Sequence, residues 1–209
     1  EFKATSRRYP AREITYFDRY GRTLEGERSE PRSMDDGPGQ MVEIDIKARP
    51  EIVWELVTDI NLSAEFSEEF QGGQWDDPDA EPGVGSTFTG HNKHPQVGEW
   101  STTSHVTMWA PPGEFAWHVS DVEQPAAQWR FTIEKVPGGS RLRYHVRLGP
   151  GRSGLTPAIE AMPGKEPRIL AGRQREHRDN MQRVVEGIKL RAETEAATNR
   201  SKASEFPKL

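Results

Sequence analysis

Cysteine is absent from this 209-residue sequence, which excludes disulfides and thiolate metal sites. The sequence also lacks an uninterrupted run of about 18 apolar residues and an apolar signal-peptide core near its first residue. Positive charge is not in excess either: the net charge is −5, so the charge balance gives no reason to expect nucleic-acid binding. These absences predict a cytoplasmic protein with no nucleic-acid partner and no stable membrane insertion.

Signatures of several enzyme classes are missing as well. There is no Ser-His-Asp order, no phosphate-binding glycine loop and no dinucleotide fingerprint. His91 and His94 have an H-x-x-H spacing, but no third metal ligand lies near them in sequence, and a hairpin turn explains the segment better. The acidic stretch WDDPDAEPG (75–83) lacks the ligand spacing of a calcium loop. We therefore predict neither a cofactor nor a metal ion.

The apolar residues that are present concentrate in the middle of the chain. Residues 1–40 carry mixed charges and the loop-like SEPRSMDDGPGQ (29–40), which predicts a flexible N-terminal extension that is dispensable for folding. Residues 195–209 are polar and small, which predicts a disordered tail. We therefore expect one folded domain over residues 41–194.

The first segment of this domain, VEIDIKARPEIVWELVTDI (42–60), changes its hydrophobic period at Pro50. Before Pro50, apolar and polar residues alternate, which predicts a strand over 42–47 with one face in solvent. After it, apolar residues recur at three- and four-residue steps, which predicts a helix over 50–57. Proline suits a first helical turn, where its missing N–H costs nothing. A second short helix is expected over 60–68.

The middle of the chain is rich in strand patterns separated by turn signals. The sequences PPG (111–113) and PGG (137–139) are strong turns between segments of matched length. This order is typical of a consecutive antiparallel meander. The strands are expected near residues 70–76, 85–92, 99–109, 114–121, 127–136 and 140–148.

Alternation along these strands divides the sheet into a dry, aromatic face and a solvated face. A long helix over 167–193, with His177, Met181 and Val185 on its apolar stripe, is expected to cover the dry face. These segments predict an α+β fold: a curved, seven-stranded antiparallel sheet around a long C-terminal helix, with two short helices after the first strand. The dry face is predicted to carry Trp100, Thr102, Ser104, Val106, Met108, Phe115, Trp117, Val119, Trp129, Phe131, Ile133, Leu142, Tyr144, Val146 and Leu148. The solvated face is predicted to carry His105, His118 and His145.

Residues 42–193 resemble the SRPBCC superfamily, the START-like and birch-pollen-allergen-like helix-grip fold. Within it, they are most similar to the bacterial polyketide cyclase/dehydrase and lipid-transport branch. The segments that carry the resemblance are residues 42–60, quoted above, GEW…APPGEFAWHV (98–119), LGPGRSGLTPAIEAMPGKE (148–166) and REHRDNMQRVVEGIKLRAE (175–193).

The resemblance implies a cavity between sheet and C-terminal helix that binds or transports an apolar small molecule, such as a lipid, a polyketide or another aromatic compound. The sequence agrees, because aromatic side chains are typical of such pockets and interspersed Thr and Ser supply a few polar contacts. The alternative is that these aromatic residues only fill an ordinary core. The residues predicted to contact the ligand are Phe88, Trp100, Thr102, Ser104, Val106, Phe115, Trp117, Trp129, Phe131, Tyr144, His177, Met181 and Val185.

Two functions are compatible with such a cavity. A non-catalytic carrier or sensor sequesters the ligand, whereas a polyketide cyclase/dehydratase folds a reactive chain there and supplies a proton-transfer group. His177 is the one histidine on an inward stripe, where it is either a general acid or base or a hydrogen-bonded edge histidine. Because no inward acid/base pair is apparent, the carrier is favoured, and whether the chain is an enzyme stays open.

A third hypothesis is a partner-binding module. It requires an exposed apolar patch outside the cavity, and the solvated sheet face does not show one. The glycine-rich GPGRSG (149–154) lies between a strand and the long helix, and we interpret it as a mobile entrance loop.

Overall fold

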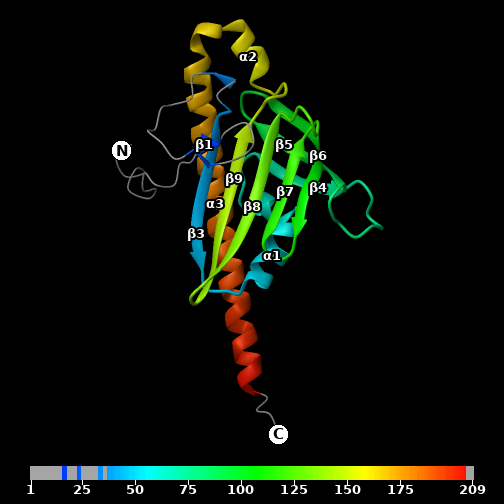
Figure 1. Ribbon diagram of the computed structural model, residues 1–209, viewed down its shortest axis with the longest axis vertical. Helices are drawn as coiled ribbons and strands as arrows, with labels where there is room; N and C mark the ends of the chain where they lie inside the picture. Colours follow the sequence, from blue (N-terminus) through cyan, green and yellow to red (C-terminus); the bar gives the residue numbers. More distant parts are fainter. Residues whose placement is uncertain (1–15, 18–22, 25–32, 35–36, 206–209) are drawn as a thin grey trace, which may run out of the picture.

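The computed structural model describes residues 16–17, 23–24, 33–34 and 37–205. Its main feature is one antiparallel sheet of seven strands in the order β3-β9-β8-β7-β6-β5-β4 (Figure 1). The strands are β3 (Gly39–Ile46), β4 (Phe70–Trp75), β5 (Thr87–His94), β6 (Gly98–Ala110), β7 (Glu114–Val119), β8 (Ala127–Val136) and β9 (Gly139–Leu148). Strands β4 to β9 form the predicted meander, and β3 returns beside β9. The predicted α+β fold is confirmed.

Strand β3 leads directly into helix α1 (Pro50–Thr58), as the change of period predicted. The second predicted helix, over residues 60–68, is only the short 3₁₀ turn η4 (Leu62–Glu65). Polar side chains near it bond to the backbone instead: Asp59 Oδ1 accepts from the N–H of Asn61 at 2.9 Å, and Ser67 Oγ accepts from the N–H of Phe70 at 2.9 Å. Such local bonds compete with helical hydrogen bonds, which explains the shorter element.

The long helix α3 (Glu166–Glu205) lies against the inner face of the sheet (Figure 1). It extends past the predicted end at residue 193, so the predicted disordered tail is helical as far as Glu205. Ala192 and Ala196 are both buried and continue the apolar stripe by one turn. Packing of this extra turn supplies the stability that the polar composition alone does not indicate. Beyond it, the helix projects past the end of the sheet (Figure 1).

A short helix α2 (Thr156–Ala161) and a 3₁₀ turn η5 (Pro163–Lys165) precede α3, and the sequence did not predict them. Neither element buries a side chain, so neither has the apolar period by which a helix is recognised. The preceding segment, interpreted as an entrance loop, is joined to α2 because the Arg152 guanidinium donates two hydrogen bonds to the Glu160 carboxylate, at 2.6 and 3.1 Å.

The folded domain begins before residue 41. Gly39 and Gln40 already belong to β3, the carbonyl of Pro38 accepts a hydrogen bond from the N–H of Leu148 at 2.8 Å, and Gln174 Nε2 donates to the carbonyl of Gly39 at 3.1 Å. Farther upstream, β1 (Tyr16–Phe17) pairs with β2 (Thr23–Leu24) and lies against β3. Within the predicted N-terminal extension, residues 1–15, 18–22, 25–32 and 35–36 lie outside the described residues.

The division into an inner and an outer sheet face holds with one local exception. A β-bulge in β6 lies between Val106, which pairs with Trp117, and Met108, which pairs with Ala116. The extra residue reverses the alternation, so Met108 is exposed and Trp109 joins the core, contrary to the prediction. The outer face is also drier than predicted near β9, where Arg147 is buried and His145 is half-buried.

Among the described helices, none is long and apolar enough to cross a membrane.

Candidate functional site

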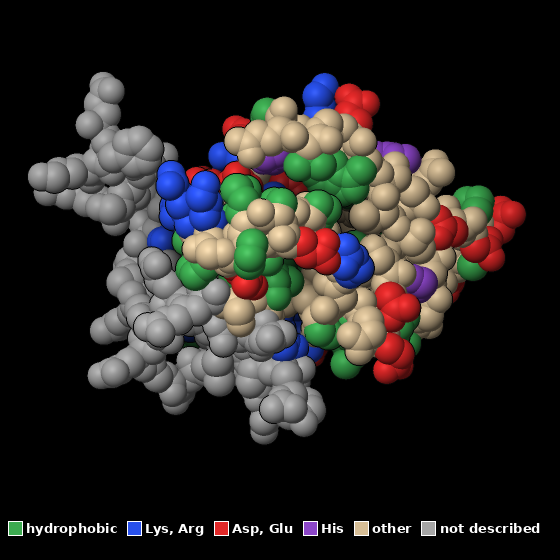
Figure 2. Space-filling view, turned by 90° about the horizontal axis from the view of Figure 1, so that it is seen from above, with side chains coloured by type: hydrophobic (Ala, Val, Ile, Leu, Met, Phe, Trp, Pro, Cys, Tyr) green, Lys and Arg blue, Asp and Glu red, His purple; other side chains and the backbone are tan. Residues whose placement is uncertain are grey.

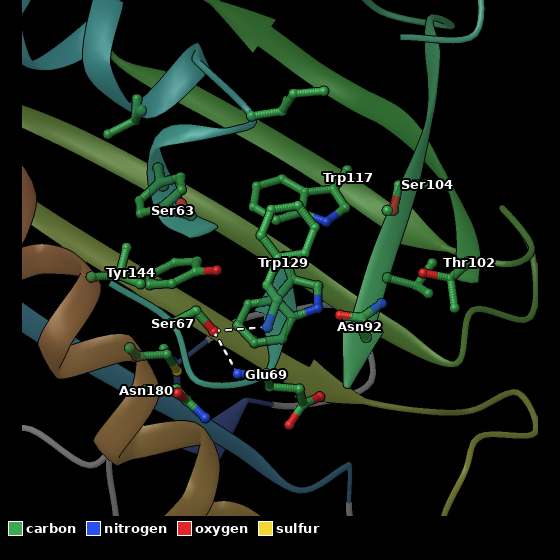
Figure 3. A pocket seen from close by; sticks show the side chains of 18 of the residues that line it. Ser63, Ser67, Glu69, Asn92, Thr102, Ser104, Trp117, Trp129, Tyr144 and Asn180 are labelled. Atoms are coloured by element: carbon green, nitrogen blue, oxygen red, sulfur yellow. Dashed lines mark hydrogen bonds between the residues drawn. The ribbon is translucent and has the colours of Figure 1, made fainter. Parts of the chain in front are cut away.

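A cavity of about 130 Å³ lies between the inner face of the sheet and helix α3 (Figure 3). Strands β5 to β9 form one wall, α3 forms the opposite wall, and the chain from α1 to the start of β4 closes the remaining side. Its lining residues are Val57, Ile60, Ser63, Ser67, Glu69, Phe70, Phe88, Gly90, Asn92, Thr102, Ser104, Phe115, Trp117, Val119, Trp129, Phe131, Tyr144, His177, Asn180, Met181 and Val184.

Aromatic rings form a continuous surface on the sheet side of the cavity. The indoles of Trp117 and Trp129 are stacked, with centroids 6.2 Å apart and planes 10° apart. Phe131 and Tyr144 stack at 4.0 Å and 15°, and Tyr144 also contacts Trp129 at 5.2 Å. Each of these residues comes from a neighbouring strand, β7, β8 or β9, and the antiparallel register places them side by side.

Six of the polar lining residues form two groups, and those of the first group are held by bonds to the protein. Ser67 Oγ accepts hydrogen bonds from the N–H groups of Glu69 and Phe70 (Figure 3). Asn180 Oδ1, on α3, accepts one from the N–H of Glu68 at 3.0 Å. These bonds shape the loop between η4 and β4 and attach it to α3.

The second group consists of Asn92, Thr102, Ser104 and Tyr144, whose side chains border the aromatic surface in Figure 3. The Tyr144 hydroxyl points towards the centre of the cavity in that view. Burial raises the pKa of this hydroxyl, and the charge of Glu69 acts in the same direction. Tyr144 is therefore a protonated hydrogen-bond donor at neutral pH.

His177 is the most unusual polar residue of the lining. The residue is 4% exposed, and its ring meets the indole of Trp129 edge-on, with centroids 5.4 Å apart at 67°. No described residue forms a hydrogen bond with its buried Nδ1. Burial holds the pKa of His177 well below its usual range, and the positive charge of Arg173 adds to the effect. The imidazole is therefore neutral at physiological pH.

An ion pair beside the cavity joins helix α3 to the start of β4. The Arg173 guanidinium donates two hydrogen bonds of 2.5 Å to the Glu69 carboxylate, and both side chains are less than a fifth exposed. Burial alone would lower the pKa of Arg173, but the bonds to Glu69 outweigh it and raise that pKa. Glu176 bonds to Arg173 as well and lies 3.6 Å from His94 Nε2, at the end of β5.

Most of the residues predicted to contact a ligand line this cavity. Three do not: Val106 and Val185 are buried in the core beside it, and Trp100 lies nearer the start of β6. The structure adds cavity residues from the chain between α1 and β4, and the polar ones among them, Ser63, Ser67 and Glu69, belong to no apolar period of the sequence. The predicted residues that line the cavity are Phe88, Thr102, Ser104, Phe115, Trp117, Trp129, Phe131, Tyr144, His177 and Met181.

The two histidines with H-x-x-H spacing lie in β5 rather than in the hairpin turn that follows it. His91 Nδ1 is 2.8 Å from Ser101 Oγ on the adjacent strand, whereas His94 faces Glu176 on α3. The described part of the chain holds no cluster of three or more His, Cys, Asp or Glu side chains suited to a metal ion.

Exposed apolar side chains are scattered over the described surface. They include Val84, Val97 and Val122 in loops, Met108 on β6 and Leu190 on α3. On the face seen in Figure 2, apolar side chains lie among charged ones of both signs. These observations do not favour the partner-binding hypothesis.

A sequence profile of the family described as polyketide cyclase / dehydrase and lipid transport matches residues 41–186. No curated protein gave a match. Among solved structures, a polyketide-cyclase-like protein of Corynebacterium glutamicum is 26% identical, with a TM-score of 0.54 over 72% of this chain and 88% of that one.

Two di-domain ARO/CYC proteins have similar structures. The one from the BE-7585A biosynthetic pathway is 16% identical, with a TM-score of 0.56 over 74% of this chain and 50% of that one. The one from the steffimycin pathway is 12% identical, with a TM-score of 0.57 over 76% of this chain and 51% of that one. This chain therefore spans about half the length of these proteins, and the likeness is one of fold.

Proposed function

Because this chain belongs to the polyketide cyclase / dehydrase and lipid transport family, we propose that it binds a small apolar molecule in the cavity between its sheet and α3. The observation that carries the proposal is the cavity itself, lined by stacked aromatic rings with a few polar groups among them. Apolar walls with a small number of placed polar groups are typical of small-molecule sites.

The volume of the cavity limits what it can hold as it stands. A dry engineered cavity of about 150 Å³ binds benzene, whereas sites for drug-sized ligands measure roughly 300–1,000 Å³. At about 130 Å³, this cavity accommodates one aromatic ring. A lipid or polyketide chain requires α3 or the loop between η4 and β4 to move outward.

The carrier function is the better supported of the two considered. A second candidate, a cyclase or dehydratase, is favoured by one observation: a neutral imidazole, His177, and a protonated phenol, Tyr144, both contact Trp129 in the same cavity. A base that removes a proton next to a carbonyl, with an acid that protonates the oxygen, is what an intramolecular condensation requires. We place it second because the cavity does not hold a folded polyketide chain at its present volume.

The test is native mass spectrometry of the protein purified from its own host, together with calorimetric titration of toluene into ligand-free protein. We expect an apolar molecule to co-purify, and toluene to bind with one site per chain. A protein that carries no ligand from its host and binds no toluene would be a structural domain, and the proposal would be abandoned.

A further inference from the structure

The hydroxyl of Tyr144 is a polar group of the cavity that the described residues leave without a hydrogen-bond partner. We infer that it donates a hydrogen bond to the carbonyl oxygen of a neutral aromatic ligand and fixes the orientation of that ligand in the cavity. This inference rests on the proposed function, because it names the ligand class and the polar contact of the same site.

The hydroxyl oxygen is open to the cavity, although the residue that carries it is buried. Tyr144 is 7% exposed, and its ring is fixed by stacking on Phe131. Its oxygen forms no hydrogen bond with any described residue, and protein atoms do not enclose it completely. Because the hydroxyl points towards the centre of the cavity (Figure 3), the surface that it keeps belongs to the cavity.

The protonation state of the hydroxyl makes it a donor. Burial and the charge of Glu69 both raise the pKa of Tyr144, so the proton stays on the oxygen at neutral pH. A buried polar group without a hydrogen bond is costly, and most such groups in proteins have a partner. An apolar ligand leaves this cost in place, whereas a carbonyl oxygen removes it. A ligand hydroxyl fits less well, because it brings a proton that needs an acceptor of its own.

Charge favours a neutral carbonyl over a carboxylate. The lining contains no Lys or Arg and one acid, Glu69. The nearby Arg173 guanidinium is bound through both of its terminal nitrogens to Glu69. The His177 imidazole is neutral, because burial lowers its pKa. A carboxylate ligand would therefore be buried without a cation of its own, which is costly.

The aromatic neighbours of Tyr144 indicate where the ring of the ligand lies. The Tyr144 ring contacts the indole of Trp129 at 5.2 Å, and that indole stacks on Trp117. The hydroxyl points towards the side of the cavity where these two indoles lie (Figure 3). A planar ligand that packs on the indoles therefore turns one edge towards Tyr144. A carbonyl on that edge is the group that meets the hydroxyl.

Ser104 is the other buried hydroxyl-bearing residue of the lining, and it lies on the far side of the indoles. It is 3% exposed and belongs to β6, whereas Tyr144 belongs to β9, with β7 and β8 between them in the sheet. Figure 3 shows Trp117 between the two hydroxyls. Ser104 is therefore the rival donor, and removing its hydroxyl is the matched control.

The experiment compares benzaldehyde with styrene by calorimetric titration, because the two molecules have nearly the same shape and differ by an oxygen in place of a methylene group. Benzaldehyde loses more hydration on entering an apolar cavity, so it is the weaker ligand unless the protein replaces its hydrogen bonds. In the parent protein, we expect benzaldehyde to bind at least as tightly as styrene, and benzoate to bind more weakly than both. In Tyr144→Phe, which keeps the ring, benzaldehyde should weaken about tenfold relative to styrene.

Two further measurements make the result specific. Ser104→Ala should leave the ratio of benzaldehyde to styrene affinity unchanged. The infrared carbonyl stretch of bound benzaldehyde should lie at a lower frequency in the parent than in Tyr144→Phe, because a hydrogen bond weakens the C=O bond. A merely structural role of Tyr144 would not move this frequency.

The other outcomes overturn the inference. A ratio that Ser104→Ala changes and Tyr144→Phe does not makes Ser104 the contact. A ratio that neither variant changes, or toluene binding without benzaldehyde binding, overturns the inference and leaves the proposed function standing. Binding of none of the three neutral molecules overturns both.

If Tyr144→Phe does not fold, the infrared spectrum of benzaldehyde in the parent and in Ser104→Ala decides. A carbonyl frequency below that of benzaldehyde in hexane, and equal in the two proteins, supports the inference. A frequency equal to that in hexane, or one that Ser104→Ala returns to it, overturns the inference.

Discussion

The ring of Phe66 packs directly on the backbone of α3 at Gly187, where a Cβ atom would overlap the ring. Phe66 follows the turn η4 and belongs to the margin of the hydrophobic core. The missing side chain at position 187 therefore lets the segment that closes one side of the cavity approach the helix closely. This contact helps to set the distance between α3 and the loop that borders the site.

Gly187→Ala should destabilise the protein, although alanine is the better helix former. The added methyl group displaces the Phe66 ring, and such overpacking costs roughly 1–3 kcal/mol. Gly172→Ala is the control on the same helix, because a Cβ there meets nothing within 4 Å. It should stabilise by roughly 0.5–1 kcal/mol. Urea unfolding of both variants measures the difference, and equal effects of the two changes would contradict the packing described.

Ser104→Phe should fill the cavity and abolish toluene binding. Ser104 is buried, lines the cavity and lies opposite Val119 in the sheet. Because the new ring occupies space that is empty of protein, we expect a loss of stability below about 1 kcal/mol, whereas an overpacked core loses about 1–3 kcal/mol. Thr103→Phe, on the outer face, should leave binding intact. A destabilised Ser104→Phe from a parent that binds no toluene would show an ordinary core.

Arg173→Met should cost roughly 3–5 kcal/mol, because it leaves the Glu69 carboxylate with little access to solvent and without its cation. Replacing both residues, as Arg173→Met with Glu69→Leu, should recover most of the loss. Arg191→Met is the control, since its partner Glu65 and Arg191 itself are about half-exposed, and the expected cost is below about 1 kcal/mol. Chemical unfolding of the parent, Arg173→Met, Glu69→Leu and the double variant gives the coupling energy, and additive effects of the two single changes would refute the pair's role.

Acidification should weaken the fold through its buried histidines. The pKa of His177 lies well below 6.5 and burial, aided by Arg130 and Arg143, lowers that of His145 to about 4. The unfolded chain therefore binds more protons between about pH 6.5 and pH 4, so the free energy of unfolding falls as the pH falls through that window. His177→Phe should lose less stability than the parent between pH 7 and pH 5, because it lacks one of the histidines whose pKa is lowered in the folded protein. The carboxylates titrate in both proteins, so their contribution to the loss is the same. Parallel slopes would show that the pKa of His177 is not lowered in the folded protein.

Two truncations should show which part of residues 1–40 belongs to the folded domain. Deleting residues 1–40 removes Pro38 and Gly39, whose carbonyls accept bonds from Leu148 and Gln174, and shortens β3. Deleting residues 1–36 keeps these bonds. We expect the longer deletion to melt several degrees lower than the shorter one, at a cost of about 1 kcal/mol for each hydrogen bond lost. Equal melting temperatures would restore a domain boundary at residue 41.

The order of helices and strands could be predicted from the sequence wherever the hydrophobic period was strong. The alternation before Pro50 and the helical spacing after it gave both β3 and α1, because each period reflects which side of an element meets the core. The elements without an apolar face, α2 and η5, had no such period. The bulge in β6 could not be predicted from the sequence either, because it arises from pairing with β7. It places Trp109 in the core and Met108 on the surface.

The architecture and the aromatic wall of the cavity could be predicted from local patterns, since alternation along β7, β8 and β9 places Trp117, Trp129 and Tyr144 on one face. The rest of the site depends on how distant segments pack together. Ser67 and Glu69 reach it from a loop without periodicity, and the ring of His177 on α3 meets that of Trp129 on β8 through the packing of helix on sheet. The volume of the cavity depends on how far α3 stands from the strands. That distance is set by contacts between residues far apart in sequence, such as Phe66 with Gly187 and Glu69 with Arg173, which no local pattern records.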